Sequence, residues 1–150
     1  MNQQTVVLTR VFDAPLQKVF DCWTRAEHLV HWFGPKGFTI HSCTTDPRAG
    51  GVFRLCMRSP QGKDYWVRGE FREVAAPAHL VITCTAEDER GVAQLQETID
   101  VAFSEDRGRT RVALNATARG PSKQAAAMLE GMEVGWAQTI DRLGTLLKVK

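Results

Sequence analysis

The sequence predicts an α+β fold in which one large antiparallel sheet packs against a long C-terminal helix. Three observations support this prediction. Residues 38–118 alternate apolar and polar side chains with a period of two, as strands with one buried face do. Turn-forming residues divide this region at short intervals, which is typical of an antiparallel meander. Residues 122–147 instead carry apolar side chains at three- and four-residue steps, the pattern of an amphipathic helix.

The first expected element is a strand at residues 5–12, which are rich in Val and Thr. A first short helix follows, because Pro15 suits the first helical turn, where its missing N–H has no partner. Asp13 or Ala14 is the expected N-cap of this helix. Its apolar face consists of Val19, Phe20 and Trp23.

A second short helix is expected directly after the first. Thr24 and Glu27 have the spacing of a capping box, in which each side chain bonds to a backbone N–H near the start of the helix. We expect this helix to carry Trp32 and Phe33 and to end at Gly34-Pro35.

The period-two region divides into six strands. They are expected at residues 38–46, 51–58, 64–75, 79–86, 93–104 and 109–118. Together with the N-terminal strand they give a seven-stranded antiparallel sheet with one apolar and one charged face. The charged face is expected to be a solvated surface with ion pairs between neighbouring strands.

Two residues, Glu97 and Trp66, do not fit the alternation. Glu97 falls on the apolar face of its strand, where an unpaired carboxylate is costly. It is either an acid inside a pocket or is turned outward by a β-bulge, and we favour the bulge. Trp66 falls on the charged face of its strand, and Gly69 is a candidate for a bulge nearby.

The C-terminal helix, residues 122–147, is long enough to cross the whole sheet. Ser122 is its candidate cap. Its apolar stripe consists of Met128, Leu129, Met132, Trp136, Ile140, Leu143 and Leu147. Gly131 and Gly135 lie one turn apart in its middle, where each costs about 1 kcal/mol relative to Ala. Either a close approach of helix and sheet or space for a ligand would offset this cost, and we favour the close approach.

Length and composition are those of an ordinary globular protein. The 150 residues are expected to form a single domain, 1–150, with 43% hydrophobic and 24% charged residues. A net charge of +2 without clustered Lys and Arg argues against a nucleic-acid partner, and no apolar run reaches the roughly 20 residues of a membrane span. The first residues lack the blocks of a signal peptide, so a cytoplasmic location is expected. The four cysteines form no C-x-x-C pair and are expected to be free, mostly buried thiols.

No motif for catalysis or for a cofactor occurs in the sequence. His28 and His31 are three residues apart on a predicted helix, but no carboxylate or cysteine pattern completes a metal site with them. His41 and His79 are isolated in the sequence. We therefore expect no metal and no cofactor, and Glu97 is the sole catalytic candidate.

Aromatic and Met side chains gather on the predicted inner surfaces of the sheet and the helices. They are Trp32, Phe33, Phe38, Phe53, Met57, Phe71, Phe103, Met128, Met132 and Trp136. These side chains suit a hydrophobic core, and they also suit the wall of an apolar pocket, which Met can adapt to a ligand. Because a long helix across a curved sheet leaves space at its middle, we expect a ligand-sized cavity there.

Several local motifs occur in a recognisable order. They are Phe12-Asp13-Ala14-Pro15, residues 19–24, Trp32-Phe33-Gly34-Pro35 with residues 36–38, residues 69–74, and residues 130–136. In this order they resemble the START-like superfamily, also called SRPBCC, and within it the branch named after the C-terminal domain of the activator of the heat-shock-protein-90 ATPase. The resemblance covers essentially the whole chain. It implies the helix-grip fold of START domains and of the birch-pollen allergen.

Relatives in this superfamily include ligand carriers, aromatic polyketide cyclases, hydrolase-like proteins and co-chaperone domains, so function has to be argued from the site. We favour binding of a small apolar or amphipathic ligand between the sheet and the C-terminal helix. One alternative is a co-chaperone or protein-interaction module with a protein partner or as a homodimer, and another is a cyclase- or hydrolase-like enzyme. A cavity with convergent polar groups would favour the first or the third hypothesis. A filled core with an exposed apolar patch would favour the second.

Overall fold

The computed structural model describes residues 2–120 and 123–148, and it confirms the predicted α+β fold. The strands are β1 (Asn2–Phe12), β2 (Thr39–Thr45), β3 (Val52–Arg58), β4 (Asp64–Ala75), β5 (His79–Glu87), β6 (Ala93–Asp106) and β7 (Arg109–Gly120). The helices are α1 (Leu16–Thr24), α2 (Ala26–Leu29), α3 (Lys123–Glu130) and α4 (Met132–Lys148). The strand boundaries therefore agree closely with those predicted from the alternation.

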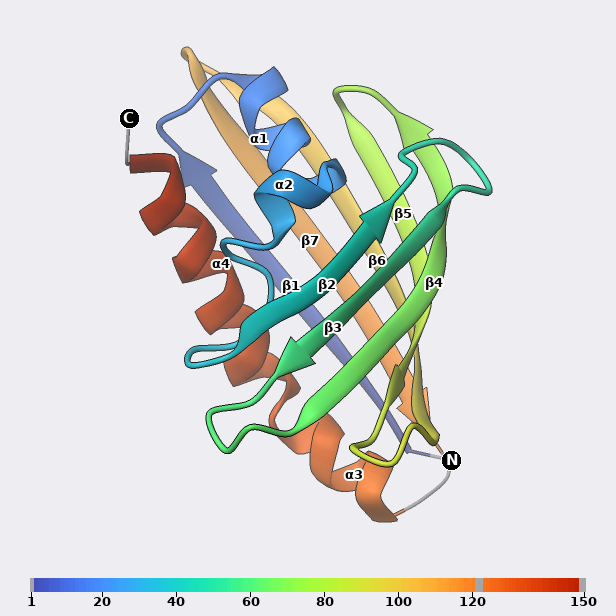
Figure 1. Cartoon of the computed structure of the whole chain (residues 1–150). Helices are drawn as coiled ribbons and strands as arrows, with labels where there is room; N and C mark the ends of the chain where they lie inside the picture. Colours follow the sequence, from blue (N-terminus) through green and yellow to red (C-terminus); the bar gives the residue numbers. More distant parts are fainter. Residues whose placement is uncertain (1, 121–122, 149–150) are drawn as a thin grey trace.

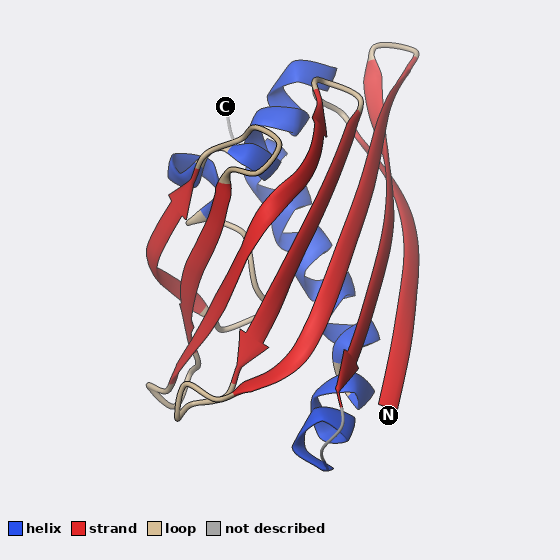
Figure 2. Cartoon of the chain, turned by 90° about the vertical axis from the view of Figure 1, so that its right-hand side faces the viewer, coloured by secondary structure: helices blue, strands red, loops and turns tan. Residues whose placement is uncertain are grey.

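All seven strands form one antiparallel sheet in the order β1-β7-β6-β5-β4-β3-β2. The sheet curves around the helices, which lie together on its inner face, with α4 running beside β1 (Figure 1). Figure 2 shows the other face of the sheet in front of the helices. The fold thus consists of two layers with the core between them.

Alternation along the strands divides the two faces of the sheet. Phe53 and Leu55 of β3 are fully buried on the inner face, whereas Arg54 between them is exposed. On the outer face, Arg68 of β4 pairs with Glu87 of β5 at 2.8 Å. The predicted ion pairs between neighbouring strands are therefore present.

Trp66 lies on this outer face, as its place in the alternation predicts. The guanidinium of Arg68 lies 4.4 Å from the centre of the Trp66 ring, a cation–π contact that covers part of the indole. His79 is not isolated in space, because its two ring nitrogens lie 3.1 Å from Glu73 and 2.8 Å from Asp100.

The predicted bulge at Gly69 is wrong, since the register of β4 and β5 shifts between Phe71 and Glu73 instead. Gly69 is needed for another reason. A Cβ atom at this position would overlap the carbonyl oxygen of Thr83 and lie 2.6 Å from the Cα of Cys84. β4 and β5 therefore approach each other too closely there for any side chain.

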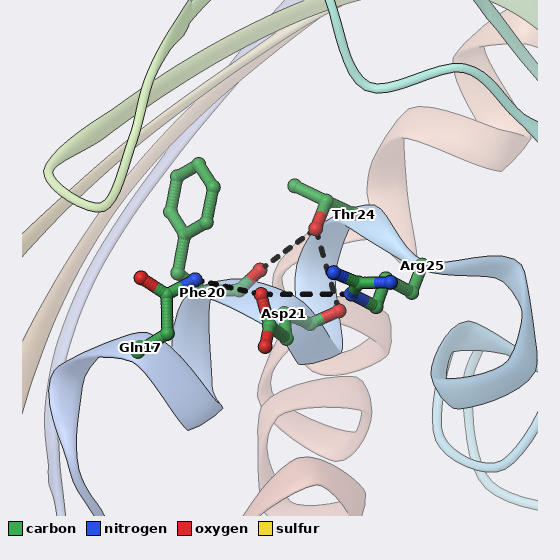
Figure 3. A network of polar contacts seen from close by, with 5 residues as sticks. All are labelled: Gln17, Phe20, Asp21, Thr24 and Arg25. Carbon is green, nitrogen blue, oxygen red and sulfur yellow. Dashed lines mark hydrogen bonds and ion pairs between the residues drawn. The ribbon is translucent and has the colours of Figure 1, made fainter.

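The predicted caps of the two short N-terminal helices are also wrong. Pro15 itself is the N-cap of α1, with extended dihedral angles and no side-chain cap bond, so neither Asp13 nor Ala14 caps this helix. Thr24 is the last residue of α1, and its hydroxyl donates to the carbonyl of Phe20 at 3.2 Å (Figure 3). Because Thr24 is used in this way, Arg25 is the N-cap of α2, and no capping box forms.

A polar network on the solvent side of α1 connects the two short helices. Gln17 donates to Asp21 at 2.8 Å, and the guanidinium of Arg25 lies 3.7 Å from the same carboxylate (Figure 3). The Phe20 ring points away from this network and packs edge-on against Phe103 of β6 at 5.3 Å. α2 ends at Leu29, so Trp32 and Phe33 follow this helix rather than belong to it.

The C-terminal helix is interrupted at Gly131, which separates α3 from α4 (Figure 1). The sequence predicted one continuous helix over 122–147, because the apolar stripe passes through this glycine without a change of period. A glycine forms helix poorly, so the chain can break there at small cost. Ser122, the candidate cap, lies outside the described residues. Neither α4 nor any other helix in the described ranges is long and apolar enough to span a bilayer.

The four cysteines have free thiols, as predicted. Cys22, Cys56 and Cys84 are buried, and Cys43 is half-buried. Burial raises the pKa of Cys22 and of Cys43 to about 11 and raises the pKa of Cys56 and Cys84 above its ordinary value.

Candidate functional site

An apolar cavity of about 200 Å³ lies between the sheet and the C-terminal helices and is open to solvent. Its wall consists of Phe33, Gly34, Pro35, Met57, Val67, Ala86, Leu95, Glu97, Ile99, Met128, Gly131, Met132, Gly135, Trp136 and Thr139. An engineered apolar cavity of roughly 150 Å³ holds benzene, whereas drug-sized ligands occupy pockets of about 300–1,000 Å³. The cavity therefore has room for a molecule about the size of one ring with a short substituent.

Larger hollows of about 720, 540 and 440 Å³ occur elsewhere on the protein. Most of the residues that line them are polar or charged, such as Arg68, Glu70 and Arg119 in the largest, which lies over the outer face of the sheet. Ligand sites are mostly apolar with a few placed polar groups, and the cavity beneath the helices has that character. We therefore take it as the candidate site despite its smaller volume.

Five of the ten predicted pocket residues line this cavity. They are Phe33, Met57, Met128, Met132 and Trp136. Four others, Trp32, Phe53, Phe71 and Phe103, are at most 3% exposed and belong to the packed core. Phe38 is half-buried near Tyr65, with 6.2 Å between the ring centres. Alternation shows which face a side chain is on, but not whether it packs against another side chain or borders free space.

The Glu97 side chain belongs to the cavity wall. The prediction that a β-bulge turns it outward is wrong. Glu97 pairs with Cys84 of β5 and Ala118 of β7 in an unbroken register, so its side chain points to the inner face. Trp136 Nε1 donates to Glu97 Oε2 at 3.4 Å, and the Cys84 thiol lies 3.9 Å from Oε1. Two donors, rather than a bulge, make the inward position tolerable.

The surroundings of Glu97 perturb its titration. Burial raises the pKa of Glu97 to about 7, while the hydrogen bonds from Trp136 and Cys84 oppose this rise. Glu97 thus exchanges its proton near neutral pH, where an ordinary glutamate is fully ionised.

A segment at residues 34–36 forms part of the cavity wall and is bound to α4. Arg142 Nη1 donates to the carbonyl oxygens of Gly34 at 2.9 Å and of Pro35 at 3.0 Å. The Lys36 N–H donates to Gln138 Oε1 at 3.2 Å, and Gly34 has a φ of 104° that favours glycine. No local pattern predicts this connection, because Arg142 is more than a hundred residues from its partners.

Metal ligation has no candidate cluster in the part of the chain that the structure describes. No three His, Cys, Asp or Glu side chains converge within residues 2–120 and 123–148, and this includes His28 and His31.

Comparisons with known proteins agree with this architecture. The sequence profile described as activator of Hsp90 ATPase homolog 1-like protein matches residues 13–148. A solved structure from Nitrosomonas europaea is 28% identical with a TM-score of 0.81, and the alignment covers 97% of this chain and 94% of that one. A Staphylococcus epidermidis structure is 26% identical with a TM-score of 0.75, over 99% and 92% of the two chains. A Silicibacter pomeroyi structure, 22% identical over 97% and 98%, has the same fold with a TM-score of 0.79. No curated protein sequence matches the chain.

Proposed function

The chain belongs to the family of activator of Hsp90 ATPase homologue 1-like proteins, and within this family we propose that it binds a small apolar or amphipathic molecule between its sheet and α4. The observation that supports this proposal is the open apolar cavity of about 200 Å³ with a single carboxyl group in its wall. Burial of one ring in such a space stabilises a complex by roughly 25 cal/mol per Å² of apolar surface removed from water. The half-buried Met57 and Met128 give the wall a shape that can adapt to its ligand.

A co-chaperone or protein-interaction role would be supported by an exposed apolar patch. The large apolar side chains exposed among the described residues are Val7, Val52, Val92 and Val134. They belong to β1, β3, the turn between β5 and β6, and α4, so they are dispersed over separate elements. Ligand binding is therefore the better-supported function. Catalysis of the cyclase or hydrolase kind would depend on Glu97, the one carboxyl group of the wall.

Ligand binding is tested with ethylbenzene, whose size suits the cavity, added to the full chain and followed by NMR. We expect saturable shifts of the Met128 and Met132 methyl groups and of the Trp136 indole N–H. Ala86→Phe, which fills the cavity from β5, should abolish them. Thr85→Phe is the matched control, because it adds the same ring on the outer face of the same strand.

Saturable binding that is lost only in Ala86→Phe supports the proposal. Shifts that spread over the surface, or that persist in Ala86→Phe, would show that the cavity is not the binding site. Native mass spectrometry of the freshly purified protein is a second test, and detection of a co-purified small molecule would support the proposal.

A further inference from the structure

The cavity wall contains a carboxyl group but no cationic side chain. Among the described residues that line it, Glu97 is the only charged one, and none is Lys, Arg or His. The nearby guanidinium of Arg142 is bound to the carbonyl oxygens of Gly34 and Pro35. An ionised carboxylate in an apolar wall is costly unless an opposite charge accompanies it.

The groups that contact Glu97 are neutral donors. Trp136 Nε1 donates to one carboxylate oxygen and the Cys84 thiol faces the other, so each oxygen has one neutral partner. On β7 the paired residue is Ala118, and on the helices Met128 and Met132 line the same space. Cys84 is the one titratable group in this contact shell, and burial keeps it protonated by raising its pKa well above the ordinary value. Hydrogen bonds thus orient the carboxylate, but its charge is not balanced.

We infer that the cavity selects a small organic cation, namely a primary amine on an apolar body about one ring in size, whose ammonium group pairs with the Glu97 carboxylate. This inference rests on the proposed ligand-binding function and specifies its ligand class. The aromatic rings of Phe33 and Trp136, 5.9 Å apart between centres, belong to the same wall. Aromatic faces attract cations in addition to their apolar packing, which favours the same class of ligand.

The test compares benzylamine with ethylbenzene, which has the same shape and number of heavy atoms but no charge. Binding of each to the full chain is measured by NMR titration at pH 8, where Glu97 is largely ionised. Glu97→Gln should weaken benzylamine binding by at least about tenfold more than it changes ethylbenzene binding. Glu105→Gln, an exposed position on the same strand, should behave as the wild type does.

The possible outcomes separate the two proposals. If ethylbenzene binds in the cavity but Glu97→Gln does not affect benzylamine, the amine inference is overturned and the ligand-binding proposal stands. If neither molecule binds in the cavity, both are overturned. If Glu97→Gln does not fold, the wild type alone decides. Its benzylamine affinity must then rise with pH as Glu97 ionises, while its ethylbenzene affinity must not, and a flat benzylamine profile overturns the inference.

Discussion

The indole N–H of Trp136 donates a hydrogen bond to Glu97 over 3.4 Å, which connects α4 to β6 at the wall of the cavity. Trp136 is 8% exposed, and its ring packs edge-on against Phe33 and lies parallel to Trp23. Trp136 and Glu97 therefore depend on each other. Packing holds the indole N–H in place, and this N–H stabilises the ionised form of Glu97.

Glu97 should make the free energy of unfolding depend on pH. Its pKa is about 7 in the folded protein and about 4.5 in the unfolded chain, so between these values the folded state retains a proton that the unfolded state has lost. The contribution of Glu97 to the free energy of unfolding is thus fully present below pH 4.5. It is lost as the pH rises through about 7, and the total loss is roughly 3 kcal/mol. Denaturant titrations of the wild type and Glu97→Gln across this range measure the difference.

Other carboxyl groups, such as Asp64 and Asp88 with lowered pKa values, change stability in the opposite direction, so the comparison between variants is the decisive quantity. Glu105→Gln should retain the wild-type pH profile. A carboxyl NMR titration that placed the Glu97 pKa near 4.5 would contradict the prediction.

Trp136→Ala should lower the free energy of unfolding by about 3–5 kcal/mol, as other large core truncations do. Val134→Ala on the exposed side of α4 is the control and should change it by less than about 0.5 kcal/mol. Trp136→Phe keeps a ring but removes the N–H donor, and it should raise the pKa of Glu97 further. A loss below about 1 kcal/mol in Trp136→Ala would mean that the indole borders solvent or empty space.

Arg142→Met should loosen residues 34–36, because two carbonyl oxygens lose a charged donor while the aliphatic stem is kept. Hydrogen bonds to charged groups contribute about 1.5–3 kcal/mol, so a loss of this order in unfolding free energy is expected. Hydrogen exchange should accelerate at the backbone N–H groups of Lys36 and Phe38. The exposed Arg90→Met variant should leave both measurements unchanged. Unaltered exchange in Arg142→Met would show that the segment is held by other contacts.

Gly69 and Gly131 should respond in opposite ways to substitution by Ala. At Gly69 the added methyl group would overlap β5, so a loss of more than about 2 kcal/mol or failure to fold is expected. At Gly131 the nearest atom to an added Cβ is the Met128 carbonyl oxygen at 3.9 Å, and Ala should stabilise the helix by about 0.5–1 kcal/mol. Thermal unfolding of the two variants measures both effects, and equal effects would contradict the assignment of these glycines.

The parts of the fold that a local period determines can be predicted from the sequence. The strands follow from alternation, and Trp136 was placed on the buried side of its helix because it belongs to a stripe with Met132 and Ile140. The break at Gly131 cannot be predicted in this way, because the apolar stripe continues across it. A helix interior tolerates glycine when packing on both sides supports it, and that support depends on the tertiary structure.

The candidate site was predicted only in part, for physical reasons of the same kind. Glu97 attracted notice because it interrupts an apolar face, but its orientation depends on the register with β5 and β7 and on a donor from α4. Phe53 and Phe71 resemble pocket residues in sequence, yet their rings pack edge-on at 5.6 Å and leave no space between them. Contacts between distant segments decide which apolar side chains border a cavity.

The buried thiols make local opening of this protein measurable without any added label. Alkylating reagents react with the thiolate, and burial keeps each cysteine protonated in the native state. For the three buried thiols, Cys22, Cys56 and Cys84, modification therefore requires exposure of the element that holds the thiol, which is α1, β3 or β5. The alkylation rate at each of these three positions thus reports how often that part of the chain opens. Because the Cys84 thiol faces Glu97 in the cavity wall, a bound ligand that stabilises β5 should slow the alkylation of Cys84.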